Sequence, residues 1–310
     1  MSQPLARAEG ILRAAAGDRV RTGFPLAPLT SFRLGGPAAL YLEPESDADL
    51  AAAGEAIVAT DVPYAVIGKG SNILVSDEGF PGLVLRLGRG YRWVAREGDR
   101  LTAGGSIPLP ALANVALRHS LAGLEFGVAI PATLGGAVRM NAGAHGGTVA
   151  EVLERIVTYR LRDGRSETVE AQDAGFGYRR SALEEDAVVT GAVLRLEAAD
   201  ANEVRARMDE AREWRRRTQP LAEPNCGSVF TNPEGDHAAR LIEAAGGKGR
   251  RIGGASVSLK HANFIVADPG ARASDVLALI RDVHRLVEDT AGVSLEPEVK
   301  LIGAFDEARR

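Results

Sequence analysis

The segment from Leu124 to Gly147, LEFGVAIPATLGGAVRMNAGAHGG, restricts the possible folds more than any other part of the sequence. It holds too many glycines to be helical throughout, because each interior glycine costs a helix about 1 kcal/mol. It is also too apolar for a solvated linker. Glycine lets a backbone approach a ligand closely. We therefore interpret the segment as a loop wrapped around a bound ligand.

A second glycine-rich turn, Gly68-Lys69-Gly70-Ser71-Asn72, directly follows a short apolar segment that reads as a strand. Its glycines allow positive φ, so that successive N–H groups can face one anion, and the serine and asparagine add side-chain donors. The sequence matches neither the G-x-G-x-x-G dinucleotide fingerprint nor the Walker loop. An ordinary strand turn explains one such loop, but it explains two of them less well.

Length, charge and cysteine content exclude several classes of protein. The 310 residues are enough for two or three domains. The 37 basic and 41 acidic residues give a net charge of -4, so the chain lacks a broad electrostatic footprint for nucleic acid. The lone cysteine, Cys226, cannot form an intramolecular disulfide and fits a reducing compartment. With no signal-type start and no apolar run of ~20 residues, we expect a soluble cytoplasmic monomer without membrane insertion.

Hydrophobic spacing predicts an α+β chain. We expect residues 1–22 to form a helix or a loosely held arm, and Asp47 to cap a helix that ends near Ala59. The other predicted helices cover residues 108–119, 202–217, 237–245 and 273–288. Predicted strands lie before Leu42, on both sides of the Gly68–Asn72 turn, at 82–87, near 101, around 155–161 and 188–196, at 263–267, and through VSLEPEVKLIG at the end.

Six motifs occur in a fixed order along the chain: TSFRLGG, GKGSN, PATLGGAVRMNAGAHGG, FGYRRS, PNCGSVFTNP and LEPEVKLIG. Together they resemble the UDP-N-acetylenolpyruvoylglucosamine reductases, which catalyse the second step of peptidoglycan precursor synthesis. The resemblance runs from about residue 20 to residue 303. Each motif alone is weak to moderate, but six in order form a specific signal.

The resemblance implies a two-lobed FAD-binding domain of the vanillyl-alcohol-oxidase type, followed by a smaller α+β substrate domain. We expect the FAD domain to span residues 23–200, with lobes at about 23–90 and 91–200, and the substrate domain to span 201–310. The cofactor-binding residues implied by the resemblance are Arg33, Gly68, Lys69, Gly70, Ser71, Asn72, Gly135, Gly136, Asn141, Ala142 and Gly143. The first turn would hold the pyrophosphate, and the second loop would lie along the flavin.

The implied reaction needs a particular set of groups. An enolpyruvyl ether is electron-rich and accepts hydride poorly, so its carboxylate must be stabilised while a proton reaches C2. The family motifs select Arg179 and Glu298 as the pair that stabilises the carboxylate, and Ser228 as the proton donor. A guanidinium can grip a carboxylate with two hydrogen bonds. Arg180, the neighbour of Arg179, stays an alternative on sequence alone.

Substrate contacts and the second substrate are also implied. Tyr178, Gln219, Asn225 and Asn232 are the candidate residues for binding the nucleotide substrate. NADPH would reduce the flavin at a shared site, which agrees with the lack of a separate nicotinamide fingerprint. The five histidines show no metal-binding spacing, so we expect no metal site.

Three features depart from the family pattern. No room exists after FGYRRS for the tyrosine loop of one branch, so the chain resembles the shorter, second type. Thr231 stands where a lysine is common, which leaves that lysine's part in diphosphate binding open. Lys300 replaces the usual arginine and loses the forked geometry of a guanidinium.

Two other functions remain open at this point. An FAD-dependent oxidase acting on an alcohol or hydroxy acid would use the same two glycine loops. A non-enzymatic flavin- or nucleotide-binding module would also keep them, but it would not need the arginine, serine and glutamate in the distal half.

Overall fold

The computed structural model describes residues 2–305, which fall into two compact units. Unit 1 comprises the described residues up to 23 together with 39–69 and 82–214. Unit 2 comprises 24–38, 70–81 and the described residues from 215 on. Two short stretches of the N-terminal half thus group with the C-terminal third. The predicted domain limits, 23–200 and 201–310, stay a prediction.

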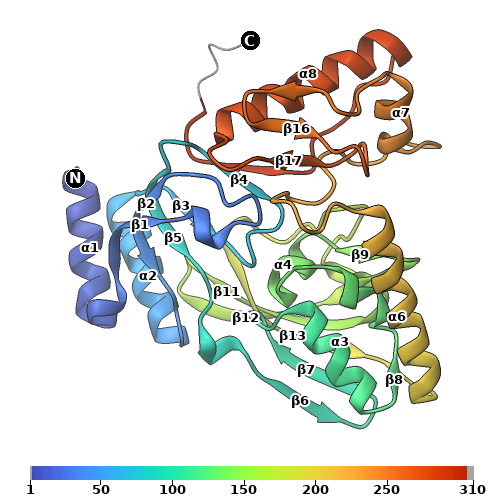
Figure 1. Ribbon diagram of the computed structural model, residues 1–310. Helices are drawn as coiled ribbons and strands as arrows, with labels where there is room; N and C mark the ends of the chain where they lie inside the picture. The colour runs from blue at the N-terminus through green and yellow to red at the C-terminus, as the bar shows by residue number, and fades with distance from the viewer. Residues whose placement is uncertain (1, 306–310) are drawn as a thin grey trace. The chain divides into compact units, whose positions relative to one another are not determined.

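The first part of unit 1 is built around a four-stranded sheet flanked by two helices (Figure 1). The strand order is β1 (Arg21–Pro25), β2 (Pro37–Leu42), β5 (Phe80–Leu85) and β3 (Tyr64–Val66). The helices are α1 (Gln3–Ala16) and α2 (Asp47–Thr60). Leu12 of α1, Leu50 of α2 and Leu83 of β5 are fully buried in one apolar cluster, so both helices pack on this sheet.

The start of α2 differs slightly from expectation. Ser46, not Asp47, is the N-cap, and its side chain accepts a hydrogen bond from the Asp49 N–H. Serine has non-helical backbone angles here and satisfies one of the open donors of the first turn. Asp47 instead lies in the first turn, where a carboxylate faces the positive end of the helix dipole.

The second part of unit 1 is an antiparallel five-stranded sheet, ordered β12-β11-β13-β7-β6. Strand β13 (Ala187–Arg195) lies in its centre and is buried along almost its whole length. Helices α3 (Leu109–Arg118), α4 (Leu134–Arg139) and α6 (Ala201–Thr218) share one apolar core with it. The remaining elements are β6 (Val94–Glu97), β7 (Arg100–Gly104), β8 (Leu121–Ala122), β9 (Gly143–Ala144), β10 (Gly147–Thr148), α5 (Val149–Val152), β11 (Leu153–Arg160), β12 (Arg165–Glu170) and β14 (Glu197–Ala198).

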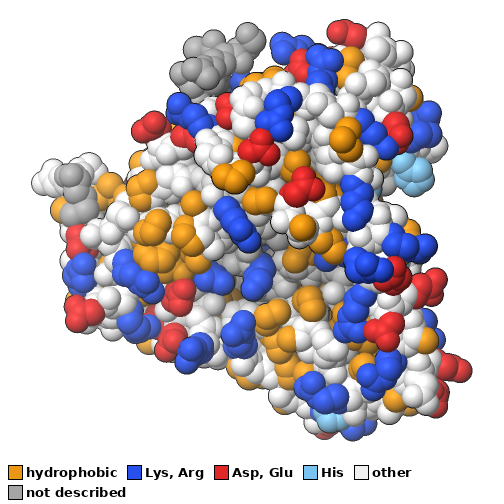
Figure 2. All heavy atoms as spheres, in the orientation of Figure 1, with side chains coloured by type: hydrophobic (Ala, Val, Ile, Leu, Met, Phe, Trp, Pro, Cys, Tyr) orange, Lys and Arg blue, Asp and Glu red, His pale blue; other side chains and the backbone are white. Residues whose placement is uncertain are grey.

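Helix α6 presents a strongly charged surface. Figure 2 shows basic and acidic side chains interspersed over this helix at the lower right of the view. Arg212 pairs with Asp209 at 2.6 Å and Arg207 with Glu125 at 2.7 Å. The apolar side of the helix is narrow, formed by Val204, Met208 and Ala211. The three arginines that end α6 complement its dipole.

Unit 2 has its own core. Its three-stranded sheet has the order β15 (Arg251–Ile252), β16 (Ala255–Val257) and β17 (Ile265–Ala267). Helices α7 (Ala238–Ala244) and α8 (Ala273–Ala291) share a buried cluster with it, and β4 (Ile73–Val75) pairs in parallel with β18 (Lys300–Ile302). Among the described helices, none has the length and apolar character of a bilayer span.

The start of α8 is capped from a distant part of unit 2. The Asp77 carboxylate accepts hydrogen bonds from the backbone N–H groups of Ala273 at 2.7 Å and Ser274 at 3.1 Å. Partial burial raises the pKa of Asp77, but hydrogen bonds from Ser274 and the helix N–H groups outweigh it and hold this pKa below its usual value. The carboxylate therefore stabilises the fold in its ionised form.

We expect Asp77→Ala to lower the free energy of unfolding by about 1–2 kcal/mol at pH 7, the usual effect of losing a helix cap. Because the folded-state pKa is lowered, the contribution is present above the unfolded-state pKa and is lost as the pH falls through the folded-state pKa. Urea unfolding of both proteins between pH 7 and pH 3 measures this. Asp289→Ala, at the exposed end of α8, is the control. A stability difference that does not shrink in acid would contradict the assignment.

Most predicted elements are found close to their expected ranges, but several strands were not predicted, among them β1, β6, β12 and β16. Strands β6 (VARE) and β12 (RSETVE) lie at the edges of the five-stranded sheet and are largely exposed. Their charged residues hide the apolar alternation on which strand prediction depends. The final predicted strand is also shorter than expected, because only Lys300–Ile302 pairs as a strand.

Candidate functional site

The turn from Gly68 to Asn72 presents a row of backbone donors. Among the described residues, none accepts a hydrogen bond from the five N–H groups of this turn. Backbone donors without a protein acceptor need another partner, and consecutive N–H groups in a glycine turn suit an anion. Lys69 is exposed within the turn. The arrangement is therefore suited to binding phosphate.

Gly70 is required by the geometry of this turn. Its φ is +67°, and a Cβ at this position would lie 2.0 Å from the Leu29 carbonyl oxygen. The close approach is fixed by the Ser31 N–H, which donates to the Gly70 carbonyl at 2.9 Å. Only glycine fits, because a side chain would meet backbone atoms that cannot rotate away.

We expect Gly70→Ala to lower the free energy of unfolding by about 3 kcal/mol, because it combines backbone strain with a collision. The control is Gly98→Ala. Gly98 has a φ of +60° but nothing within 4 Å of its Cβ position, so only the cost of about 1 kcal/mol from the left-handed backbone applies. Urea unfolding of the three proteins measures both values. Equal losses would show that the contact with Leu29 is unimportant.

The second glycine loop already uses most of its own donors inside unit 1. Gly135 N–H donates to Gly105, Gly136 N–H to the Thr133 hydroxyl, and Ala142 N–H to Ala137. The Asn141 side chain is also engaged: its Nδ2 donates to the Gly177 carbonyl at 3.0 Å, and its Oδ1 accepts from Ala150 N–H at 3.0 Å. The loop therefore offers a small-residue surface and carbonyl oxygens more than free N–H groups.

Arg179 lies on a tight turn next to this loop in unit 1. Gly177 and Arg180 exchange backbone hydrogen bonds, which leaves Tyr178 and Arg179 at the two central positions. The φ of Arg179 is +57°, a value usually reserved for glycine at this place in a turn. Its Nη1 donates to the Gly143 carbonyl at 3.0 Å. The guanidinium therefore lies against the glycine loop, whereas Arg180 is exposed.

Sequence reasoning missed Arg139, which holds the chain that follows this turn. Its guanidinium donates to the carbonyl oxygens of Leu183, Glu184 and Ala187. Its own carbonyl accepts from the Ser181 hydroxyl at 2.9 Å. Burial lowers the pKa of Arg139. The available signal was a single charged residue in the otherwise uncharged run from Val128 to Asn141.

In unit 2, Ser228 follows a turn that Asn225 shapes. Asn225 Nδ2 donates to the carbonyls of Pro220 at 3.0 Å and Glu223 at 2.7 Å, and its Oδ1 accepts from Gly227 N–H at 2.9 Å. Gly227 has a φ of +82°, which turns the chain just before the serine. Ser228 is half-buried. The asparagine amide is thus committed to the turn that presents this hydroxyl.

The structure brings Ser228 and Glu298 onto neighbouring segments. Glu298 N–H donates to the Val229 carbonyl at 2.7 Å, and Thr231 N–H donates to the Glu296 carbonyl at 2.9 Å. Phe230 and Pro297 form an antiparallel bridge between these bonds. Residues 70 positions apart in sequence therefore lie side by side within unit 2.

Cys226 is buried in the turn that leads to Ser228. Burial raises the pKa of the Cys226 thiol, and the negative charge of Glu298 raises it further. The thiol therefore stays protonated and is a poor nucleophile.

Asn72 connects the first glycine turn to the Glu298 strand. Its Nδ2 donates to the Glu298 carbonyl at 3.2 Å, and its own carbonyl accepts from Lys300 N–H at 3.0 Å. These bonds continue the parallel pairing of β4 with β18. Asn72 therefore has a contact in unit 2 that its place in the glycine turn did not indicate.

The remaining candidates have different surroundings. Gln219 accepts a hydrogen bond from Arg215 Nε at 2.6 Å, and Asn232 Oδ1 accepts from Ala238 N–H at the start of α7. Tyr178 is 59% exposed. Arg33 is exposed and has a φ of +58°. Strained backbone of this kind gathers at functional sites.

The three predicted catalytic residues are divided between the units. Ser228 and Glu298 belong to unit 2, and Arg179 belongs to unit 1. Their convergence at one substrate stays a prediction. Among residues 2–305, no cluster of three or more His, Cys, Asp or Glu side chains is arranged to hold a metal ion.

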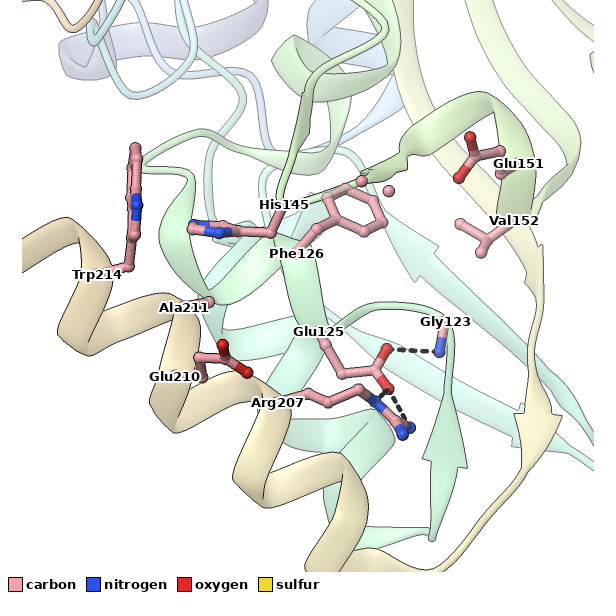
Figure 3. A pocket seen from close by; sticks show the side chains of 12 residues that line it. Gly123, Glu125, Phe126, His145, Glu151, Val152, Arg207, Glu210, Ala211 and Trp214 are labelled. Atoms are coloured by element: carbon pink, nitrogen blue, oxygen red, sulfur yellow. Dashed lines mark hydrogen bonds and ion pairs between the residues drawn. The ribbon is translucent and has the colours of Figure 1, made fainter.

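A cavity of about 580 Å³ lies inside unit 1, beside α6. Figure 3 shows His145 and Trp214 meeting edge to face, with ring centroids 5.0 Å apart. Glu125 accepts hydrogen bonds from Gly123 N–H and from Arg207 in its wall. None of the predicted site residues lines this cavity, although His145 follows Gly143 by two positions.

Two family models match the chain. The model of the C-terminal domain of UDP-N-acetylenolpyruvoylglucosamine reductase matches residues 219–302. The model of an FAD binding domain matches residues 38–172. The first model covers Ser228 and Glu298, and the second covers both glycine loops.

Whole-chain relatives agree with these matches. A UDP-N-acetylenolpyruvoylglucosamine reductase of Anaeromyxobacter sp. (strain Fw109-5) is 46% identical over 96% of this chain and 93% of its own length. One from Heliobacterium modesticaldum is 45% identical over 90% of this chain and 89% of its own. The crystal structure of the Thermus caldophilus reductase covers 92% of this chain and 99% of its own, with 38% identity and a TM-score of 0.80. A glucose oxidase variant of Phl p 4 shares the fold at 15% identity and a TM-score of 0.52, covering 63% of this chain and 44% of its own.

Proposed function

The chain belongs to the UDP-N-acetylenolpyruvoylglucosamine reductase family, and we propose that Arg179, Ser228 and Glu298 perform the chemistry of that reaction in it. The protein is a flavin-dependent oxidoreductase that uses FAD and NADPH. It reduces the enolpyruvyl double bond of UDP-N-acetylenolpyruvoylglucosamine to give UDP-N-acetylmuramate, in peptidoglycan precursor synthesis. The predicted fold, cofactor and reaction are confirmed by these matches.

The residues of the first glycine turn fit FAD. Five N–H groups, from Gly68 to Asn72, lack a protein acceptor among the described residues, and a diphosphate offers the acceptors they need. We assign Gly68, Lys69, Gly70, Ser71 and Asn72 to the diphosphate, with Arg33 as an added cation. When bound, FAD supplies hydride transfer, from NADPH to the substrate.

The second glycine loop would meet the cofactor in another way. Gly135 and Gly136 lack side chains, and the Asn141 amide is used internally. We assign Gly135, Gly136, Asn141, Ala142 and Gly143 to a surface on which the cofactor packs. The loop's own hydrogen bonds would keep that surface fixed.

The observation that carries the catalytic proposal is the pairing of the Ser228 and Glu298 segments. As C3 of the substrate gains hydride, negative charge builds up on its carboxylate. Arg179 stabilises that charge, and Glu298 polarises or protonates the carboxylate. Ser228 gives its hydroxyl proton to C2, which completes the saturated product. A serine hydroxyl is a weak acid and needs a strongly basic carbon within hydrogen-bond reach.

The nucleotide substrate is assigned to Tyr178, Gln219, Asn225 and Asn232. Tyr178 has the exposed ring that such a contact needs. Asn225 already makes three internal hydrogen bonds, so its part would be to shape the turn before Ser228. We also propose that the enzyme works in the cytoplasm as a monomer, with its buried Cys226 reduced.

The reaction is tested directly with purified protein. A yellow protein with a flavin spectrum, and NADPH oxidation that requires the enolpyruvyl nucleotide, is the expected result. NADPH-independent flavin reduction by an alcohol or hydroxy acid would instead favour the oxidase alternative. The likeness to Phl p 4 concerns the fold alone and does not favour that alternative.

A further inference from the structure

We propose that Asn263 is a positioning residue that fixes Ser228 for proton transfer by holding the backbone of the residues that follow it. The inference rests on the proposed role of Ser228. Asn263 belongs to unit 2, is only 3% exposed, and was not among the residues singled out from the sequence.

The Asn263 side chain pairs with both backbone groups of Phe230. Its Oδ1 accepts from Phe230 N–H at 3.0 Å, and its Nδ2 donates to the Phe230 carbonyl at 2.8 Å. Its main-chain carbonyl also accepts from Val229 N–H at 2.9 Å. One buried residue thus makes three hydrogen bonds to the two residues after Ser228.

The same short segment is held from the Glu298 strand. Glu298 N–H donates to Val229, and Thr231 N–H donates to Glu296. Val229 and Phe230 are each only 1% exposed. Without Asn263, the backbone around Ser228 would be held mainly by its hydrogen bonds to residues 296–298. Its position relative to Glu298 would then be less well fixed.

Asn263 is held in place by the unit 2 sheet and by a turn at His261. It precedes β17, which pairs with β16 in the unit 2 sheet. Its own N–H donates to His261 Nδ1 at 3.3 Å, and Phe264 N–H donates to the His261 carbonyl at 3.0 Å. The Ser228 segment is therefore tied to the sheet through this turn.

Alanine and aspartate do not reproduce these contacts. Alanine would leave a buried N–H and a buried carbonyl of Phe230 unpaired. Aspartate has nearly the same shape but lacks the donor, so it would place a carboxylate against the Phe230 carbonyl. Small displacements of a reacting group can cost about 10²-fold in rate. Asn263→Asp therefore tests position with little change in volume.

The experiment uses the full chain with FAD bound. Stopped-flow absorbance follows two steps separately, flavin reduction by NADPH and flavin reoxidation by the enolpyruvyl nucleotide at saturating concentration. We expect Asn263→Asp to slow reoxidation by about 30-fold, within the range for misplaced groups, and to leave flavin reduction within about 3-fold of the unmodified protein. Asn263→Ser keeps one of the hydrogen bonds. It replaces Asn263→Asp in this test if the aspartate variant does not fold.

Two comparisons separate positioning from general destabilisation. Ile265→Ala removes a buried side chain in the adjacent β17 and should lower the melting temperature without slowing reoxidation. Asn263→Asp combined with Ser228→Ala should be no slower than Ser228→Ala alone, because residues that act together are non-additive.

These experiments distinguish failure of the positioning role of Asn263 from failure of the proposed role of Ser228. Additive losses in the double variant, equal loss in both steps, or unchanged reoxidation in Asn263→Asp would overturn the inference while Ser228→Ala alone remains slow. If Ser228→Ala leaves reoxidation unchanged, the proposed role of Ser228 fails, and the positioning role fails with it.

Discussion

Ser228→Ala is expected to slow reoxidation of the flavin by the enolpyruvyl nucleotide about 10³-fold. A positioned general acid contributes about 10²–10⁴-fold to a rate, and alanine leaves no proton to give to C2. Flavin reduction by NADPH needs no proton from this serine, so its rate should stay unchanged. Stopped-flow absorbance of the two half-reactions measures the difference.

Ser256→Ala is the control for this test. Ser256 lies in β16 of the same unit and is also half-buried, but it pairs with the sheet and not with the Glu298 segment. Ser256→Ala should leave both half-reactions unchanged. Equal slowing of both half-reactions in Ser228→Ala would count against proton donation, because that pattern indicates a damaged cofactor site.

The sequence predicted local structure better than it predicted contacts. The helices α2, α3, α6, α7 and α8 were located within a few positions. The clearest case is α8, whose buried apolar residues recur on one side of the helix. The motif order also predicted the family. The edge strands β6 and β12 were missed because their exposed sides carry charge.

The long-range pairing could not be predicted from local pattern. Nothing in NCGSVF or LEPEVK shows that Val229 and Glu298 share a hydrogen bond, because that contact joins segments almost 70 residues apart. Hidden supports were missed for the same reason. Arg139 and Asn263 were missed, and the internal hydrogen bonds of Asn141, a predicted site residue, were not foreseen, because these side chains pair with backbone groups of distant segments. Only Arg139 left a signal, as the single charge in an uncharged run.

The residues with positive φ give a further view of the candidate site. Six described residues other than glycine have a positive φ, and three of them, Arg33, Asn141 and Arg179, were predicted site residues. Asparagine tolerates this conformation, but arginine does so only at a cost of about 1–2 kcal/mol. Such strain persists where the surroundings determine the conformation. For Arg179, the surroundings are the exchanged hydrogen bonds of Gly177 and Arg180 and the contact with Gly143.

We expect Arg179→Asn to slow flavin reoxidation by the enolpyruvyl nucleotide about 10²–10³-fold, the usual effect of removing a group that stabilises developing charge. Asparagine is chosen because it accepts the φ of +57° that this position requires. The turn should therefore remain, and the melting temperature should change little. Flavin reduction by NADPH should be unaffected, since the role proposed for this cation is to stabilise the carboxylate of the nucleotide substrate.

Arg180→Ala decides between the two neighbouring arginines. Arg180 is exposed, and its side chain packs over Gly177, whereas Arg179 Nη1 donates to Gly143 in the glycine loop. Arg180→Ala should therefore keep reoxidation within about 3-fold, as expected if Arg179 alone binds the substrate carboxylate. Slow reoxidation in Arg180→Ala together with a normal rate in Arg179→Asn would transfer the carboxylate-binding role to Arg180. Normal rates in both variants would leave the substrate carboxylate to Glu298 and require a cation from another part of the chain.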